Sequence, residues 1–525
     1  MGEPASLREP PGRRWTVGPW TVVLASVLAA GLLATVGSLT DLCLGDENPH
    51  VRRVREYIRC RERVPYDPLF EQERLKPVVF MGTPLWHTGL SVLWWLCGSE
   101  WQPLAQAYQA GFYLLLVLSV YFGVRHYFGP SGASWAWLTA ASMPMVGVYS
   151  VVLYQDLPGV AMSALAFWLL WRRNFLWAGV AFAAAYLTKM NMLSFAPWAV
   201  VFAAWWARGS WKRRFTMATL VATPVLAALL YDFAWRFEVY DASEGIWSLM
   251  GTRCVEMPPA IQKIARAAAP DARLWSPFGA ENPTSIISHF GIPALVGLVL
   301  TLGRFRDRRG WWLWGCLALA VSGFLVVFAP TGCTQVRYLF PVALVAAPLA
   351  GWGLSSLRFP RWLLWLVVAA CVIQSAGALA YVYSARRISD DDNEGYAWIR
   401  RNTPADARIM YPEETVTNQT GRPYVWHLLN PAYLMTEATD AERQTMFSYF
   451  GVTHVAIPLR RVYDRRKEGA HAGGYEKHFV EQASTLPYLE RVFANEGFVI
   501  YTYTPQGGDA PQATIPAPTP ADGAP

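Results

Sequence analysis

The residues of this chain that could do chemistry stand beside the ends of apolar stretches, where a charged group is costly and usually serves a function. They are three acids and three residues that can carry positive charge: Asp46, Glu47, Asp156, His50, Lys189 and Arg337. Cations of this kind bind phosphate through charge-assisted hydrogen bonds. A carboxylate beside them can take the proton from a hydroxyl as its oxygen attacks. Together they suit a site that handles a phosphate-linked group.

Each of these residues also has a plain structural explanation, which the sequence leaves open. The two acids after the first apolar run can be a solvated loop start, and Asp156 can serve a turn, because Asp favours turns. Lys189 and Arg337 can be snorkelling side chains at helix ends. His50 can be an ordinary surface histidine.

The composition indicates which elements must position these residues. Of the 525 residues, 53% are hydrophobic and 16% are charged, whereas a soluble domain carries about 25% charged residues. Apolar runs recur from Trp15 to Tyr383, and one bilayer crossing needs about 20 such residues. Tryptophans stand at the ends of many of these runs, as they do at membrane interfaces. We therefore expect an all-α polytopic membrane protein.

The apolar runs and the basic loops between them predict a topology. We expect about eleven membrane-spanning helices, at residues 17–39, 105–124, 132–153, 157–171, 175–188, 192–207, 215–233, 286–303, 311–329, 338–356 and 361–383. If the N-terminus is cytoplasmic, every short Arg-rich loop falls on the cytoplasmic side, as the positive-inside rule requires. The six polar residues then lie together at the outer headgroup level of the cell membrane.

One further apolar segment, residues 84–97, is nearly long enough to cross. Counting it would invert every later loop, so we expect it to lie in, or dip into, the outer membrane face. It belongs to an outer loop, residues 40–104, in which residues 50–63 have the spacing of an amphipathic surface helix. A second outer loop covers residues 234–285. With these loops, residues 1–383 form the expected membrane domain.

The C-terminal part, residues 384–505, is predicted to be a small extracytoplasmic α/β domain. Helices are expected at Asp390–Arg401, Asp440–Phe450 and Tyr475–Ala483, and strands at Ala407–Tyr411, Val452–Pro458 and Phe498–Tyr503. Residues 506–525 are rich in Pro, Ala, Gly and Thr, and we expect a disordered tail there.

The charge and the cysteines exclude two other kinds of site. The net charge of +7 comes from basic residues in short loops, which topology explains without a nucleic-acid partner. The seven cysteines have no metal-ligand spacing, and the histidines show none either. No metal site is therefore predicted.

The order of short motifs along the chain resembles a known superfamily. Asp46-Glu47 follows the first apolar run, and then come Gly82-Thr83-Pro84-Leu85, Tyr154-Gln155-Asp156, Leu187-Thr188-Lys189-Met190-Asn191 and Arg337-Tyr338-Leu339-Phe340-Pro341. This order looks like the GT-C glycosyltransferases that use polyprenyl-phosphate sugars, such as protein O-mannosyltransferases and the aminoarabinose transferases of lipid A. The string from Asp46 to His50, with Tyr57 and Tyr66-Asp67-Pro68, is also similar to the dolichyl-phosphoglucose α-1,2-glucosyltransferase.

The resemblance covers residues 15–460 and departs from the family at one motif. The family usually has His-Pro-Pro or Lys-Pro-Pro before the re-entrant segment, whereas this chain has Thr83-Pro84, with His87 three residues later. The departure concerns the acceptor side of the site. The short similarity to the glucosyltransferase does not assign glucose as the sugar.

The resemblance implies an activity and a role for each candidate residue. A sugar would pass from a polyprenyl-phosphate donor to an extracytoplasmic acceptor hydroxyl on a lipid, a glycan or a protein. Asp46 would be the general base, with Glu47 as its neighbour or substitute, and Asp156 would orient the acceptor or the sugar. Lys189 and Arg337 would hold the donor phosphate, with His50 assisting. No cofactor is implied; two carboxylates could ligate a divalent ion, but no obligatory metal is predicted.

Two other classes of function remain open from the sequence. A transporter or flippase for a lipid-linked glycan would place charges near the bilayer midplane and would show inverted repeats. Here the charges stand at one face, and no repeat is visible. A non-catalytic scaffold would tolerate loss of Asp46. The sequence identifies neither the sugar nor the acceptor.

Overall fold

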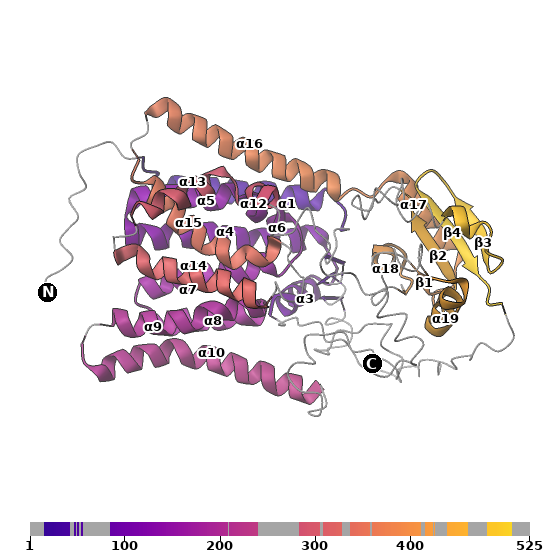
Figure 1. The fold of residues 1–525 in the computed structure, drawn as a ribbon, viewed down its shortest axis with the longest axis horizontal. Coiled ribbons are helices and arrows are strands. Elements are labelled where there is room, and N and C mark those ends of the chain that lie inside the picture. The colour runs from indigo at the N-terminus through magenta and orange to yellow at the C-terminus, as the bar shows by residue number, and fades with distance from the viewer. Residues whose placement is uncertain are drawn as a thin grey trace. The chain divides into compact units, whose positions relative to one another are not determined.

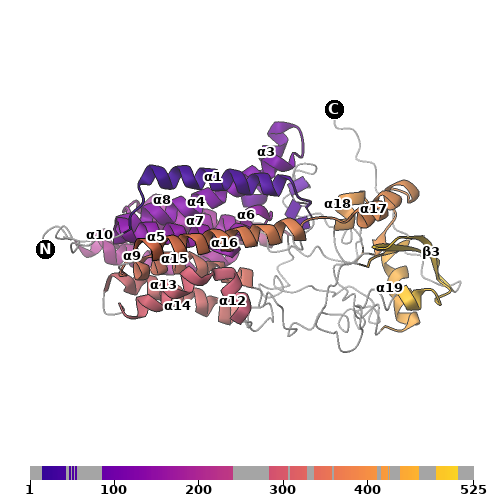
Figure 2. The ribbon, with the colours of Figure 1, turned by 90° about the horizontal axis from the view of Figure 1, so that it is seen from above.

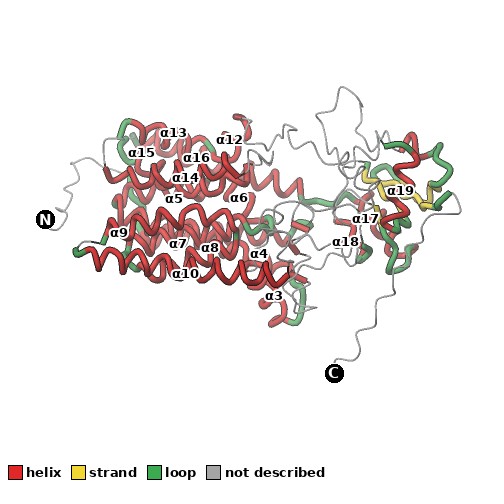
Figure 3. Tube along the Cα trace, turned by 60° about the horizontal axis from the view of Figure 1, so that its bottom comes forward, coloured by secondary structure: helices red, strands yellow, loops and turns green. Residues whose placement is uncertain are grey.

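The chain folds into two units that are described separately. The computed structural model describes residues 15–42, 47–48, 50–51, 54–55, 85–207, 209–239, 283–304, 308–327, 336–357, 360–410, 415–423, 425, 438–459 and 480–506. A helical unit comprises residues 1–40, 82–241 and 272–385, and a C-terminal unit comprises residues 41–81, 242–271 and 386–525. All the described strands lie in the C-terminal unit (Figure 3).

The helical unit is built from the apolar runs of the sequence. Its elements are α1 Pro19–Ser38, α3 Leu85–Cys97, α4 Gln102–Phe128, α5 Pro130–Ser142, α6 Pro144–Val151, α7 Asp156–Trp171, α8 Phe175–Thr188, the 3-10 helix η1 Met190–Phe195, α9 Ala196–Trp206, α10 Trp211–Val239, α12 Pro283–Phe290, α13 Ile292–Leu302, α14 Arg308–Val327, η4 Val336–Leu339, α15 Phe340–Leu354 and α16 Arg361–Ala385. Every predicted span contains a helix, and the short segment at 84–97 forms α3. Eight of the described helices carry proline in their first two positions, where its missing N–H has no partner to lose.

Among the described residues, five helical stretches are long and apolar enough to cross a membrane. They are Pro19–Ser38, Gln102–Phe128, Trp211–Asp232, Arg337–Leu354 and Trp362–Asn402, and the bent pair α6–α7 would add a sixth. Helix α16 runs along the outside of the bundle and exposes Trp365 and Ile373 by 69% and 71% (Figures 1 and 2). Such large exposed apolar surfaces are typical of membrane contact. The count of eleven crossings stays a prediction.

Two expected spans are divided among the described helices: residues 286–303, between α12 and α13 at Gly291, and residues 132–153. Residues 132–153 form two helices, α5 and α6, which meet at Met143. Pro144 disfavours helical dihedral angles at the residue before it, and Met143 accordingly has the extended values φ −65° and ψ 118°. Helix α6 then breaks from α7, and the two axes differ by 118°.

The C-terminal unit carries a four-stranded sheet with helices. Its elements are α17 Asp390–Asn402, β1 Ile409–Met410, α18 Thr415–Thr420, α19 Asp440–Phe450, β2 His454–Pro458, β3 Leu489–Ala494 and β4 Phe498–Tyr503. The sheet order is β1-β2-β4-β3, with β1 parallel to β2 and the other pairs antiparallel. Successive strand residues point to opposite faces. Val455 and Ile457 accordingly join one apolar cluster while Ala456 joins the other.

Most of the predicted elements of this unit are present. Ser389 caps α17, which begins with three aspartates, and Thr439 and Glu442 form a capping box on α19. Strand β3 and helix α18 were not predicted. Of the helix expected at 475–483, residues 480–483 are helical and the rest lies outside the described residues, as does the tail after residue 506.

We expect His454, the first residue of β2, to make the stability of the C-terminal unit depend on pH. It is half-buried, and desolvation lowers its pKa below the usual value of 6.5. The folded state therefore resists protonation, whereas the unfolded chain binds a proton from pH 6.5 downward. We expect stability to be lost as the pH falls from the unfolded pKa to the folded pKa.

The measurement is the urea concentration at which half of the C-terminal unit is unfolded in the full-length protein. Pulse proteolysis monitors this unfolding at a pH of about 7.5 and of about 5.5. His454→Gln should flatten the difference between the two pH values, because glutamine does not titrate. An undiminished pH dependence in His454→Gln would contradict the assignment to this histidine.

Candidate active site

A partly shielded ion pair joins two of the predicted site residues. Asp156 is the first residue of α7, and Lys189 follows the last residue of α8 in extended conformation. The Lys189 Nζ atom lies 3.2 Å from Asp156 Oδ1, and the side chains are 16% and 1% exposed. The close approach requires Gly159, because a Cβ there would lie 2.9 Å from the Cβ of Lys189. The structure thus places a carboxylate and an ammonium group at one end of α7.

Arg337 lies close to this ion pair and contacts the rings of two tyrosines, Tyr154 and Tyr338. Its guanidinium carbon lies 5.3 Å from the ring centre of Tyr154 and 5.1 Å from that of Tyr338. Arg337 also donates from Nη2 to the Tyr338 hydroxyl at 3.3 Å, and Lys189 Nζ is 5.7 Å from the Tyr338 ring. Cations at such distances are attracted by the ring face. We call this group, Asp156, Lys189, Arg337, Tyr154 and Tyr338, the Asp156 corner.

Several polar atoms of this region have no hydrogen-bond partner among the described residues. They are both carboxylate oxygens of Asp156, Oε1 of Gln155 and both amide atoms of Asn191. The Asp156–Lys189 contact is therefore one of charge and not a directed hydrogen bond. An unpaired buried polar group costs about 1–3 kcal/mol, so such a cluster is expected to meet its partners in a ligand or in water.

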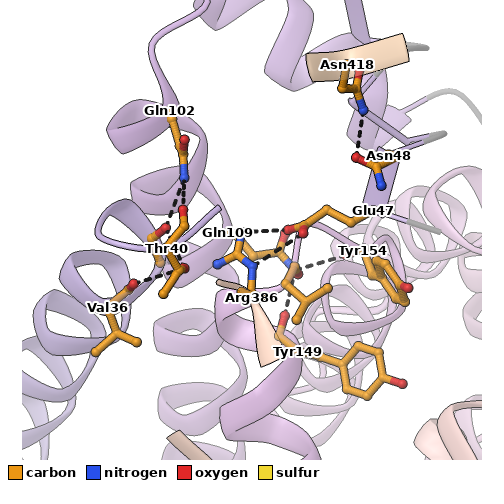
Figure 4. A network of polar contacts seen from close by, with 12 residues as sticks. Val36, Thr40, Glu47, Asn48, Gln102, Gln109, Tyr149, Tyr154, Arg386 and Asn418 are labelled. Atoms are coloured by element: carbon orange, nitrogen blue, oxygen red, sulfur yellow. Dashed lines mark hydrogen bonds and ion pairs between the residues drawn. The ribbon is translucent and has the colours of Figure 1, made fainter. Parts of the chain in front are cut away.

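The remaining predicted site residues belong to the C-terminal unit. Glu47 is fully buried and paired with Arg386, whose Nη2 lies 2.8 Å from Oε1 and whose Nε lies 3.3 Å from Oε2 (Figure 4). Both side chains are 0% exposed. His50 is also buried, at 7% exposure. Asp46 directly precedes Glu47 and lies outside the described residues, as do Thr83-Pro84 and most of the loop 234–285.

The segment around Glu47 is held by further hydrogen bonds within the C-terminal unit. Asn48 donates to the Thr415 hydroxyl at 2.9 Å and accepts from Asn418 at 2.7 Å (Figure 4). Arg55 donates to Asn418 at 2.6 Å. Helix α18, which the sequence did not predict, thus anchors the segment that follows the first apolar run.

A buried acid that sequence reasoning missed lies on the side of the helical unit formed by α8 and α10. Asp232 of α10 is 2% exposed and accepts a hydrogen bond from the Tyr186 hydroxyl of α8 at 2.5 Å. The two helices lie side by side (Figures 1 and 3). Tyr186 precedes Lys189 by three residues. The Tyr186–Asp232 hydrogen bond therefore holds α8 against α10 near the end of α8 that leads to Lys189. An acid at the end of an apolar run was the signal that could have indicated it.

The architecture and part of the sequence match known glycosyltransferases. A family model described as dolichyl-phosphate-mannose-protein mannosyltransferase matches residues 100–235, a stretch that contains Asp156 and Lys189. The oligosaccharyltransferase of Archaeoglobus fulgidus, solved with a tethered acceptor peptide, has a TM-score of 0.60 at 12% identity, covering 93% of this chain and 74% of that one. The chain therefore has the fold of these GT-C glycosyltransferases, and the family model covers 100–235 of its 525 residues.

A second solved structure has a similar fold and matches this chain over nearly the whole length of both proteins. ArnT from Cupriavidus metallidurans, bound to undecaprenyl phosphate, has a TM-score of 0.56 at 14% identity, with coverage of 93% of this chain and 98% of ArnT. No curated protein matches the sequence. At such low identity the likeness establishes the fold alone, and the roles of the individual site residues stay predictions.

Proposed function

We propose that this enzyme transfers a sugar from a polyprenyl-phosphate donor to a hydroxyl of an extracytoplasmic acceptor. The observation that carries the proposal is the Asp156 corner, where two cations and one carboxylate meet at the ends of apolar helices. Two solved relatives support the kind of donor. ArnT holds undecaprenyl phosphate, and the archaeal oligosaccharyltransferase has been solved with dolichol-phosphate and an inhibitory peptide.

The reaction needs a proton acceptor and a means of carrying the charge of the leaving phosphate. The acceptor oxygen attacks the anomeric carbon, the bond from that carbon to the phosphate oxygen breaks, and polyprenyl phosphate leaves with the electron pair. Asp46 takes the hydroxyl proton. Lys189 and Arg337, assisted by His50, stabilise the phosphate charge, as positioned cations do in such transfers.

Asp156 and its neighbours complete the proposed roles. Asp156 orients the sugar or the acceptor, and the unpaired atoms of Gln155 and Asn191 would be met by sugar hydroxyls. Because both Glu47 oxygens contact Arg386, we assign anchoring to Glu47 and proton transfer to Asp46. Neither a metal nor a nucleotide has a role in this scheme.

The membrane arrangement follows from the same proposal. The enzyme crosses the cell membrane with its N-terminus in the cytoplasm and its C-terminal unit outside. A polyprenyl donor keeps its tail in the bilayer and presents its phosphate at the headgroup level, where the predicted topology places Lys189 and Arg337.

The deciding experiment is transfer of labelled sugar in membranes that contain the full-length enzyme. Labelled polyprenyl-phosphate sugar should give a labelled acceptor product, and labelled nucleotide sugar alone should give none once lipid-linked donor synthesis is blocked. Movement of the donor across the membrane without a new glycosidic bond would instead indicate a flippase. Mass spectrometry of envelope glycans from a deletion strain would then identify the sugar and its acceptor.

Lys189→Met tests the binding of the donor phosphate. Hydrogen bonds to a charged group contribute about 1.5–3 kcal/mol, and about 1.4 kcal/mol is a factor of ten in affinity. We therefore expect the KM for the donor to rise by about 10- to 100-fold, and binding of sugar-free polyprenyl phosphate to weaken equally.

The matched control for this substitution is Lys212→Met. Lys212 is exposed in the first turn of α10, next to a loop that the predicted topology places on the cytoplasmic side. Its replacement should change the KM by less than about twofold. Equal donor affinity in Lys189→Met and the unaltered enzyme would contradict the assignment of Lys189 to the phosphate.

A further inference from the structure

A single glutamine side chain holds the break between α6 and α7. Gln109 of α4 is completely buried, and its Nε2 atom lies 2.7 Å from the carbonyl oxygen of Tyr149, 3.1 Å from that of Val152 and 2.9 Å from that of Tyr154. Figure 4 shows this amide between Tyr149 and Tyr154. The last carbonyls of a helix have no partner within it, and α6 ends at Val151. Gln109 supplies the donor that the break requires.

A second contact determines which way the glutamine amide points. The indole Nε1 of Trp86, on α3, donates to Gln109 Oε1 at 3.1 Å. An indole N–H can only donate, so the oxygen of the amide must face Trp86 and its nitrogen must face the carbonyls. Trp86 is itself 1% exposed, and its carbonyl accepts from the Tyr108 hydroxyl at 3.3 Å. The orientation of Gln109 is therefore set by packing on α3.

The break that Gln109 stabilises leads directly into the Asp156 corner. Tyr154, whose carbonyl accepts from Gln109, presents its ring to Arg337, and Asp156 follows two residues later at the start of α7. Unpaired carbonyls are especially unfavourable where water is excluded. Loss of the Gln109 donor should therefore change the backbone conformation between α6 and α7. A shift of about 1 Å in a catalytic group can cost about 100-fold in rate.

We propose that Gln109 is a positioning residue of this enzyme, which fixes the Tyr149–Tyr154 carbonyls and thereby places Tyr154 and Asp156 for sugar transfer. The inference rests on the proposed function and adds to it a residue that touches no substrate. Gln109 acts through the backbone of the break, and its effect on transfer passes through Asp156.

The test compares Gln109→Met with Gln106→Met in the full-length enzyme. Methionine keeps the length of the side chain and removes its hydrogen bonds. Gln106 is equally buried on the same helix, but its side chain lies against Gly37 of α1. We expect kcat to fall about 100-fold in Gln109→Met with a donor KM within about threefold of the unaltered enzyme, and a less than about threefold change of kcat in Gln106→Met.

A double-mutant cycle separates positioning from general damage. If Gln109 acts through Asp156, the effects of the two substitutions are not independent. The kcat of the Gln109→Met, Asp156→Asn double variant should then lie within about threefold of that of Asp156→Asn alone. Hydrogen exchange gives a second readout that needs no activity. Amides of residues 149–156 should exchange faster in Gln109→Met and at an unchanged rate in Gln106→Met.

Three results would overturn the inference: unaltered kcat in Gln109→Met, losses that multiply in full with Asp156→Asn, or an equal loss in Gln106→Met. Failure of the proposed function is a separate result, because it would appear as absence of transfer from polyprenyl-phosphate sugar by the unaltered enzyme.

Discussion

Asp46→Asn should lower the rate of sugar transfer by about 10²- to 10⁴-fold, the range typical of a lost general base. Asparagine has nearly the shape of aspartate but cannot accept the acceptor's hydroxyl proton. The loss should therefore appear in kcat, with donor affinity and folding close to those of the unaltered protein. The measurement is initial transfer of labelled sugar by purified enzyme, at equal amounts of folded protein.

Asp390→Asn is the matched control for this result. Asp390 is an exposed acid at the start of α17, and its replacement should leave transfer within about twofold. Transfer at an undiminished rate by Asp46→Asn would remove Asp46 from the mechanism. Absence of transfer by the unaltered protein would instead favour the scaffold interpretation.

Glu47→Gln should have the largest effect on stability of any single substitution considered. It leaves the guanidinium of Arg386 charged and fully buried without its carboxylate partner. Breaking a buried ion pair from one side typically costs about 3–5 kcal/mol of the free energy of unfolding. The urea midpoint of the full-length protein in detergent should therefore fall. Pulse proteolysis at residues of the C-terminal unit monitors this unfolding.

The double variant Glu47→Leu with Arg386→Met separates anchoring from catalysis. Replacing both charges with apolar groups often restores stability, because no charge remains buried without a partner. We expect most of the lost stability and most of the transfer rate to return. A stable double variant without transfer would instead make Glu47 the base and would contradict its assignment as an anchor.

The helices could be predicted from the sequence because their signals are local. An apolar run of sufficient length and a basic loop beside it do not depend on distant residues, and α1, α7 and α8 lie within a few residues of their predicted bounds. The division of residues 132–153 was missed although Pro144 marks it. The hydrophobic signal runs through the proline without interruption, so hydropathy alone sees one span.

The proximity of three candidate site residues could be predicted from the sequence. The topology placed Asp156, Lys189 and Arg337 on one face, and the structure brings these three together through Tyr154 and Tyr338. The pairing of Glu47 with Arg386 could not be predicted, because the residues are 339 positions apart and only the tertiary fold joins them. Gln109 carried a usable signal, since a glutamine within an apolar helix needs partners.

The strand β3 shows why the C-terminal unit was read incompletely. Glu490 and Arg491, near its start, are exposed, so the strand lacks the continuous apolar run that marked β4. Strand β3 is recognised by its pairing with β4, which includes a register shift between Arg491 and Phe493. Pairing of this kind is a property of the assembled sheet and not of the local sequence.

The anchoring of the loop after α1 also limits how this protein can be divided. Asp41 donates its N–H to the Arg386 carbonyl at 2.8 Å and accepts from the N–H of Ile388 at 2.8 Å, next to the Glu47–Arg386 pair. Residues 339 and 347 positions apart in the sequence thus pack together in one region of the C-terminal unit. A chimera that exchanges residues 386–525 with those of a relative must exchange residues 41–55 as well, because neither stretch brings its own partners. Residues 386–525 are for that reason not an independent folding unit, and sequence changes in them should be accompanied by changes in residues 41–55.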